Sequence, residues 1–369
     1  MQVVNVEIPQ TEQENYPIFI GENASEKLFG VLNGISSKKI LVVTNETIFA
    51  IYADNIKNIF RETKKLVEYC ILPDGEAYKN KTSLETILAC AFENKLERND
   101  VMVAFGGGVI GDITGFASAI YLRGINFIQV PTTILAQVDS SVGGKVAINT
   151  PYGKNLLGAF YQPRAVISDL KFLKTLPENE ILAGLSEVVK YSFIEKTCGG
   201  EFVDFAQFLY ANQKDIFKLE NDKIASMVEI CCKLKAKVVE QDEKEKGLRV
   251  ILNFGHTIGH AIEKCTNYNI FKHGEAVAIG MKAVFMISLA LGKINEEYYN
   301  FATDLLKSYK FDFKIPKNIS PEQIADALSY DKKVQNGCVR FVLPVGYAKV
   351  EIFNDISREI IENTLKELY

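Results

Sequence analysis

The sequence predicts an α/β fold in which an N-terminal α/β domain with a doubly wound, mainly parallel sheet precedes a mostly α-helical C-terminal domain. In the first half of the chain, short apolar runs alternate with amphipathic stretches, which is typical of parallel strands connected by helices. From about Thr175 onward, apolar residues instead recur with the 3.6-residue period of helices. A length of 369 residues allows two domains, and turn-forming residues near Pro177 favour domains over 1–172 and 173–369.

The strands are predicted from apolar runs that end in turn residues or glycines. These runs cover 38–44, 66–73, 100–108 and 127–131, and a helix over 46–65 separates the first two. In the second half, the helical period covers 178–196, 222–245, 254–266, 274–292 and 295–309, and residues 341–353 are typical of a short hairpin.

Composition disfavours several classes of partner. The net charge of −4 indicates no general affinity for nucleic acid, so a small anionic substrate would need a local cluster of Lys and Arg. The N-terminus has no basic run before an apolar stretch, and no run of about eighteen apolar residues occurs, so we expect neither a signal peptide nor a membrane span. Seven scattered cysteines without a CxxC pair indicate reduced thiols and a cytoplasmic protein.

A glycine-rich turn is the candidate nucleotide site. Gly106, Gly108 and Gly111 match G-x-G-x-x-G between a predicted strand and a helix, where glycines let the backbone approach a pyrophosphate. A tight strand-to-helix turn would need the same glycines, so the motif alone is ambiguous. No acidic residue follows the next strand to bind a ribose. Glu76 in PDGE, after the preceding strand, could bind it, although PDGE is also simply a good turn.

Two lysines follow in glycine-containing segments. VPTT (130–133) ends a predicted strand, which is where α/β proteins usually bind ligands. The Gly143–Gly144 turn is predicted to present Lys145, and GKN is predicted to present Lys154 and Asn155 in a second loop. Together they suggest phosphate contacts, although surface loops often carry lysine and either residue alone would be weak support.

The second half contains a charged pair in an apolar helix and all three histidines. Glu187 and Lys190 share one helix face, which indicates either a structural ion pair or a site. His256, His260 and His273 lie within eighteen residues, and two or three His with one Glu suit a catalytic zinc. Spacing alone favours His256 and His260 as the metal pair, and the absence of H-E-x-x-H argues against a metalloprotease.

Gly255 and Gly259 each precede a histidine, so another element could approach closely there. Lys235 and Arg249 flank the acidic run QDEKEKG. These two residues either belong to a solvated charged stretch or bind a carboxylate, which Arg can hold through two hydrogen bonds.

Twelve ordered motifs resemble those of the 3-dehydroquinate synthase family of sugar-phosphate cyclases. They are GGGVIGD, RGINFIQVPTT, QVDSSVGGK, GKN, GAFYQP, TLP, the Glu187/Lys190 pair, KAKVV, DEKEKGLR, NFGHTIGHA, HGEAVAIGM and DKK at 331–333. The resemblance extends from near the N-terminus to about residue 345, and glycerol dehydrogenase-like enzymes are more distant relatives in fold.

The resemblance implies conversion of 3-deoxy-D-arabino-heptulosonate 7-phosphate to 3-dehydroquinate and phosphate in the shikimate pathway. NAD would oxidise the C5 hydroxyl, phosphate would leave by elimination, the same NADH would reduce the ketone, and an intramolecular aldol step would close the ring. The substrate phosphate would itself serve as the base in the elimination. The resemblance also implies a Zn²⁺ or Co²⁺ ion acting as a Lewis acid, and a homodimer.

Carried over by position, the resemblance implies Glu187, His256 and His273 as metal ligands, and it assigns His260 to the substrate phosphate instead. Further phosphate contacts are implied for Lys145, Asn155, Asn253, Lys332 or Lys333, and Arg123 from the partner subunit. Lys235 and Arg249 are implied to hold the carboxylate, and Asp139 and Lys190 to contact ring hydroxyls.

The positions implied for NAD are Asp74, Glu76, Lys79, Gly106, Gly107, Gly108, Val109, Asp112, Thr132, Thr133, Asp139, Ser140, Lys145, Lys154, Phe172 and Thr175. One departure lies in VTNET, because the family often has Asp near Thr44 or Asn45 to contact the adenosine.

Three other functions compete with this one. A sister cyclase would use a phosphorylated sugar without a carboxylate, which the pair Lys235 and Arg249 disfavours. A metal-dependent polyol dehydrogenase would share the fold, NAD and the metal, but would release NADH. A non-enzymatic binding protein would not need Glu187, His256 and His273 together.

Overall fold

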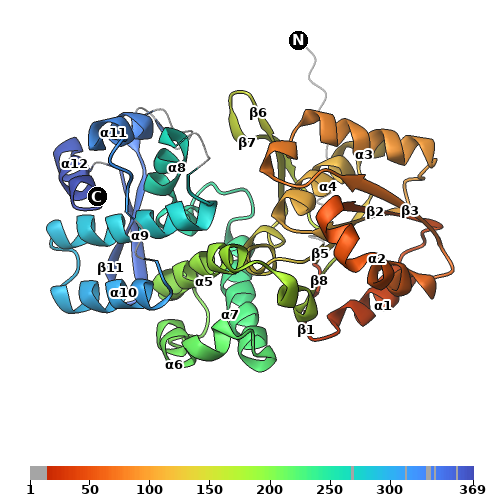
Figure 1. The fold of residues 1–369 in the computed structure, drawn as a ribbon, viewed down its shortest axis with the longest axis horizontal. Helices are drawn as coiled ribbons and strands as arrows, with labels where there is room; N and C mark the ends of the chain where they lie inside the picture. Colours follow the sequence, from red (N-terminus) through yellow and green to blue (C-terminus); the bar gives the residue numbers. More distant parts are fainter. Residues whose placement is uncertain (1–14, 267–269, 312–313, 330–333, 336–337, 355) are drawn as a thin grey trace, which may run out of the picture.

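The computed structural model describes residues 15–369 except 267–269, 312–313, 330–333, 336–337 and 355. A β-sheet with its helices forms the N-terminal half, and a mainly helical part forms the C-terminal half beside it (Figure 1). Helices α5 (Glu178–Cys198) and α7 (Asn221–Gln241) lie where the two halves meet, and α7 contacts the edge strand β1 (Ile18–Gly21).

Six strands form the N-terminal sheet in the order β1-β8-β5-β4-β2-β3, and every neighbouring pair is parallel. The four predicted strands are confirmed as β2 (Lys39–Asn45), β3 (Leu66–Leu72), β4 (Val101–Gly106) and β5 (Asn126–Pro131). The structure adds β1 and β8 (Ala165–Asp169), whose runs of four and five residues are too short to stand out in the sequence.

Helices cover both faces of this sheet, as the doubly wound prediction requires. Helices α1 (Lys27–Asn33) and α2 (Glu46–Arg61) pack on one face, and α3 (Lys81–Glu93) and α4 (Gly108–Ile120) pack on the other. Strand β2 has β3 on one side and β4 on the other, so the winding direction changes at β2. Ligands of open α/β sheets usually bind at the carboxyl ends of strands beside such a switch point.

An antiparallel hairpin of β6 (Lys145–Thr150) and β7 (Gly153–Phe160) follows the Gly143–Gly144 turn. That turn is confirmed, with φ of 90° and 65°, and it leads directly into Lys145. The predicted loop around Lys154 and Asn155 is wrong, because both residues lie in β7. The hairpin packs against α4, where a Cβ on Gly115 would lie 2.3 Å from Val146 Cγ1. This contact joins segments that are distant in the sequence. No local sequence pattern therefore predicts the hairpin.

The predicted helices of the second half are confirmed as α5, α7, α8 (His256–Cys265), α9 (His273–Ala290) and α10 (Glu296–Ser308), and the predicted hairpin as β11 (Phe341–Gly346) with β12 (Lys349–Phe353). The structure also has α6 (Phe205–Phe217), α11 (Pro321–Ser329) and α12 (Arg358–Lys366). Helix α7 ends before residue 245, because the Asp242 carboxylate accepts the N–H groups of Lys246, Gly247 and Arg249 and folds the chain into a turn.

Helices α8 and α9 are in backbone contact through glycines, which confirms the predicted close approach at Gly255 and Gly259. A Cβ on Gly259 would lie 3.0 Å from the Ala276 carbonyl oxygen, and one on Gly280 would lie 2.0 Å from the Gly255 carbonyl oxygen. Helix α9 is long and apolar enough to span a bilayer, but it is 67% buried among the other helices and is a core helix of this fold.

Candidate active site

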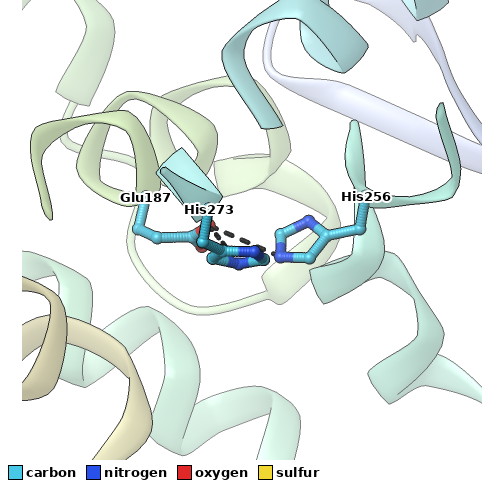
Figure 2. A group of neighbouring side chains, drawn as sticks. All are labelled: Glu187, His256 and His273. Atoms are coloured by element: carbon cyan, nitrogen blue, oxygen red, sulfur yellow. Dashed lines mark ion pairs between the residues drawn. The ribbon is translucent and has the colours of Figure 1, made fainter. Parts of the chain in front are cut away.

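Three predicted metal ligands converge from three helices. Glu187 lies in the middle of α5, His256 is the first residue of α8, and His273 is the first residue of α9 (Figure 2). His256 Nε2 lies 3.4 Å and His273 Nε2 lies 3.7 Å from Glu187 Oε1. Glu187 is fully buried, and its Oε1 has no hydrogen-bond partner among the described residues. Two imidazole nitrogens thus face a buried carboxylate oxygen that lacks a donor.

The opposite ring nitrogens of both histidines are held by acceptors. His256 Nδ1 lies 3.0 Å from the Phe254 carbonyl oxygen, and His273 Nδ1 lies 3.4 Å from Glu263 Oε2. When Nδ1–H donates to such an acceptor, Nε2 carries the lone pair that can bind a metal. In that tautomer, both rings would direct an Nε2 lone pair towards Glu187.

Glu263 on α8 is a site residue that the sequence prediction does not include. Its buried carboxylate accepts from Lys154 Nζ at 3.0 Å as well as from His273. Burial alone would raise the pKa of Glu263, but the hydrogen bond and charge of His273, together with Lys154, lower it to about 2. Glu263 lies seven residues after His256 on one helix face, and this spacing is the signal that could have identified it.

The arrangement distinguishes between two possible metal groups that share His273. The second group is His260, Glu263 and His273, and the His260 ring centre lies 5.7 Å from that of His273. Both oxygens of Glu263 have partners, Lys154 and His273, whereas Glu187 pairs with Lys190 through Oε2 only, and its Oε1 has no donor among the described residues. The geometry therefore favours Glu187, His256 and His273, and His260 borders this cluster instead of belonging to it.

A second cluster of charges lies beside the metal candidates. Lys190 forms a buried ion pair with Glu187 and lies 4.0 Å from Asp139 Oδ1. Asp139 also accepts from Lys235 Nζ at 2.9 Å and from the Tyr191 hydroxyl at 2.8 Å. Burial would raise the pKa of Asp139, but the charges of Lys235 and Lys190 hold it well below its usual value. Asp139 is therefore ionised and fixes two ammonium groups in place.

Arg249 lies near the same cluster and is only 1% exposed. Its Nη2 donates to the Gly143 carbonyl oxygen at 2.8 Å, and its Nη1 donates to the Glu243 carbonyl oxygen. Its Nε is buried and has no acceptor among the described residues. A buried donor without a partner is costly, so this nitrogen is suited to receive a ligand oxygen.

Lys145 and Asn253 meet at Glu245, another residue missing from the predicted site. Glu245 Oε2 lies 2.5 Å from Lys145 Nζ, and Glu245 Oε1 accepts from Asn253 Nδ2 at 3.1 Å. In the sequence, Glu245 is one of several acidic residues in QDEKEKG, and nothing distinguishes it from its neighbours.

The glycine-rich turn lies at the carboxyl end of β4, where α4 begins. A Cβ on Gly107 would lie 3.1 Å from Thr133 Cγ2, and one on Gly108 would lie 3.0 Å from Ser140 Oγ. Thr132 Oγ1 is buried without a hydrogen-bond partner in the described part of the chain. The start of α4 is thus open to a ligand only because the turn has no side chains. Gly106 is buried here, and Val109 is half-buried.

Other predicted NAD positions form hydrogen-bonded pairs around this turn. Lys79 Nζ lies 2.5 Å from Asp112 Oδ2 and 2.6 Å from Asn155 Oδ1, so the structure places Asn155 beside this pair. The remaining pairs are Glu76 with Asn149 at 2.7 Å, Asp74 with Asn45 at 2.6 Å, and Thr175 with Tyr52 at 2.6 Å. Phe172 is buried in the core, edge-on to Tyr52 and Phe105.

Asn45, the departure from the family pattern, has a structural role. Its Oδ1 accepts from Ile48 N at the start of α2, and its Nδ2 donates to Asp74. Thr44 is buried and its Oγ1 has no partner among the described residues.

Arg123 lies in an exposed turn away from these clusters in the sequence, between α4 and β5. Leu122 and Arg123 both have positive φ, 49° and 66°, which non-glycine residues rarely adopt. Lys332 and Lys333 lie outside the described residues.

Two family models match the chain: the 3-dehydroquinate synthase N-terminal model over residues 69–183 and the C-terminal model over residues 184–334. A 3-dehydroquinate synthase of Nostoc punctiforme is 43% identical over 366 residues, covering 99% of both chains. One of Francisella tularensis is 47% identical over 315 residues, covering 85% of this chain and 86% of the relative.

Solved structures share the whole fold. A 2-deoxy-scyllo-inosose synthase in complex with carbaglucose-6-phosphate, NAD⁺ and Co²⁺ is 26% identical, with a TM-score of 0.83 over 95% of this chain and 96% of that one. A 2-epi-5-epi-valiolone synthase of Streptomyces hygroscopicus with bound NAD⁺ and Zn²⁺ is 20% identical, with a TM-score of 0.86 over 98% and 99%. Family models over more than half of the chain and relatives along almost all of it show that this protein belongs to the 3-dehydroquinate synthase family of the shikimate pathway.

Proposed function

We propose that the chain converts 3-deoxy-D-arabino-heptulosonate 7-phosphate to 3-dehydroquinate and inorganic phosphate, with NAD and a divalent metal ion as cofactors. The observation that carries this proposal is the buried Glu187 carboxylate oxygen, which faces His256 and His273 and has no donor among the described residues. Beside it, the cationic side chains of Lys190, Lys235 and Arg249 provide for an anionic substrate in a chain whose net charge is −4.

The residues present fit a zinc or cobalt ion. Two imidazoles and one carboxylate are a common donor set for catalytic Zn²⁺, and Co²⁺ accepts the same donors. Glu187, His256 and His273 would hold the ion, and Phe254 and Glu263 would orient the two rings from behind. When bound, the metal polarises the oxygen of the alcohol that is oxidised.

The turn after β4 fits NAD. Gly107 and Gly108 leave space beside Thr133 and Ser140, and the N-terminus of α4 favours a pyrophosphate there. Asp74, Glu76 and Lys79 lie at the carboxyl end of β3, on the other side of the switch point, where they would bind the nucleotide's sugar. When bound, NAD would supply reversible hydride transfer, which leaves the overall reaction without net oxidation.

The protein's own groups would bind and orient the substrate. Lys235 and Arg249 would bind the carboxylate, with Arg249 Nε as a ready donor, and Asp139 and Lys190 would contact ring hydroxyls. The phosphate would be held by Lys145, Asn155, Asn253, His260, Lys332 or Lys333, and Arg123 of a second subunit. With the phosphate as the base for its own elimination, these residues need only hold it near the proton that is removed.

We further propose a homodimer in which Arg123 enters the neighbouring site. The strained turn at Leu122 and Arg123 is held by hydrogen bonds from Arg98 Nη2 to the Leu122 carbonyl and from Gly124 N–H to the Tyr121 carbonyl. Such strain often marks a functional position. Large apolar side chains near it, Ile120 at 44% and Leu122 at 38%, are exposed on the single chain and would be covered by a second copy.

Mixing two inactive variants tests the shared site. Arg123→Ala and Glu187→Gln are each expected to be inactive, and subunit exchange between them should restore activity, because one site of the mixed dimer then has both groups. A mixture that stays inactive although subunits exchange, as seen by tagged pull-down, would contradict the shared site.

The same proposal divides the chain into an NAD-binding domain over 1–172 and a metal- and substrate-binding domain over 173–369. It also places the enzyme in the cytoplasm, which the free thiols of the described cysteines support.

A phosphate-release assay with the seven-carbon keto-acid phosphate tests the proposal. We expect one phosphate per product with NAD in catalytic amount, loss of activity with a chelator, and recovery with Zn²⁺ or Co²⁺. NADH accumulating in step with product would indicate a polyol dehydrogenase, a class whose fold resembles this one at TM-scores near 0.67. Equal activity on a sugar phosphate without a carboxylate would indicate a sister cyclase.

A further inference from the structure

Tyr16 connects the segment before β1 to the turn that precedes Lys145. Its hydroxyl oxygen accepts a hydrogen bond from the Gly143 N–H at 3.0 Å, across 127 residues of sequence. Burial raises the pKa of Tyr16, so the hydroxyl is neutral near pH 7. The sequence motifs do not single out this tyrosine, and the proposed mechanism does not use it.

Gly143 is held from two sides by Tyr16 and Arg249. Its N–H donates to Tyr16, and its carbonyl oxygen accepts from Arg249 Nη2 at 2.8 Å. The residue has a φ of 90°, and a Cβ here would lie 2.6 Å from Arg249 Nη2, so only glycine fits. A rotation of this glycine would therefore move the acceptor that fixes the guanidinium.

The guanidinium of Arg249 has its Nε–H left as a donor for a ligand. Its two terminal nitrogens donate to the carbonyls of Gly143 and Glu243, and its buried Nε has no acceptor among the described residues. The direction of Nε is set by the two occupied nitrogens, because the guanidinium is planar and rigid. Whatever holds Gly143 thus also sets where Nε points.

We propose that Tyr16 is a positioning residue that fixes Gly143 and thereby aims Arg249 Nε at the carboxylate of the substrate. This rests on the proposed function, which assigns the carboxylate to Arg249. The hydroxyl acts through Gly143 and does not touch the reacting atoms, so its loss weakens carboxylate binding and leaves the chemical step largely unchanged.

Binding of two partial ligands to the holoenzyme with NAD and metal tests this role by calorimetry. The reaction product 3-dehydroquinate keeps the carboxylate and lacks the phosphate. Inorganic phosphate represents the phosphate group and has no carboxylate. In Tyr16→Phe, which removes only the hydroxyl, we expect about fivefold weaker binding of 3-dehydroquinate and unchanged binding of inorganic phosphate. In steady state, KM should rise by a similar factor while kcat stays within about twofold.

Tyr309→Phe is the matched control, because the Tyr309 hydroxyl donates to the Leu209 carbonyl oxygen at 2.9 Å within the helical core. It should leave the binding of both ligands unchanged. In an Arg249→Lys background, which lacks the planar guanidinium, Tyr16→Phe should produce no further loss.

Three outcomes would overturn the proposal: unchanged binding of 3-dehydroquinate, equal weakening of both ligands, or the same fivefold loss in the Arg249→Lys background. If the proposed function itself were wrong, the wild-type enzyme would release no phosphate from the seven-carbon substrate. That result is distinct from all three outcomes above.

Discussion

Lys145 Nζ and Glu245 Oε2 lie 2.5 Å apart, and the same carboxylate also accepts from Asn253. Lys145 and Asn253 are both proposed phosphate contacts, so the Glu245 carboxylate holds the donors that the substrate phosphate would use. Glu245 has a φ of 57°, in the turn that follows α7. An incoming phosphate would therefore compete with this carboxylate for the same two donors.

Glu245→Gln should strengthen the binding of inorganic phosphate. The substitution removes a negative charge beside the phosphate position and frees the full charge of Lys145. Because the Lys145 side chain is 44% exposed, water screens the pair and the expected gain is about fivefold at most. Phosphate inhibition constants measure it. Glu240→Gln, which alters an exposed pair with Lys237, is the control. Weaker binding in Glu245→Gln would show that Glu245 helps to hold the phosphate.

Glu263→Gln should weaken metal binding. The Glu263 carboxylate accepts from His273 Nδ1, and such outer partners typically contribute about tenfold to a hundredfold to metal affinity. Competition with a chromophoric chelator gives the affinity for Zn²⁺. Equal affinity in the variant and the wild type would mean that the His273 ring is oriented by the surrounding helices alone.

Gly280→Ala should destabilise the fold. The new methyl group would lie 2.0 Å from the Gly255 carbonyl oxygen, so the backbones of α8 and α9 must separate. Overpacking of this kind costs about 1–3 kcal/mol, and thermal unfolding should show the loss. Gly30→Ala in α1, where no atom lies within 4 Å of the new Cβ, should be neutral or slightly stabilising. Similar melting temperatures for Gly280→Ala and the wild type would contradict the tight contact.

Cys198 and Cys232 should resist alkylation in the folded enzyme. Burial raises the pKa of each thiol to about 12, so about one thiol in ten thousand is ionised at pH 8. Cys90 and Cys265 are only partly buried and should react first. Mass spectrometry after a timed iodoacetamide treatment gives the order, with an unfolded sample as the reference in which all thiols react. Labelling of Cys232 as fast as Cys265 would show that α7 opens readily.

Prediction from the sequence succeeds where a local pattern decides the structure. Strands such as β4 are buried along their whole length and read as continuous apolar runs. It fails for the β6–β7 hairpin, whose order depends on Gly115 of α4, and for the end of α7, which depends on the Asp242 carboxylate.

The candidate metal site shows the same limit. Helical spacing pairs His256 with His260, because both lie on one face of α8. The structure instead brings His256 to His273 and Glu187, which lie on other helices, and only the contacts between α8, α9 and α5 produce that meeting. The family resemblance supplied this assignment, and spacing alone could not. The sequence likewise does not identify Glu245 and Tyr16 as residues of the site, because their hydrogen-bond partners are distant in the sequence.

The glycine contact between α8 and α9 has a consequence for how this protein can vary. His256 and His273 begin the two helices, and the spacing between those helices is set by Gly255, Gly259 and Gly280, where main chain touches main chain. Substitutions among the surrounding apolar side chains can therefore accumulate without spreading the two ligands. Substitutions that conserve volume can then alter the interior of the helical half at modest cost, provided that these three positions keep no side chain.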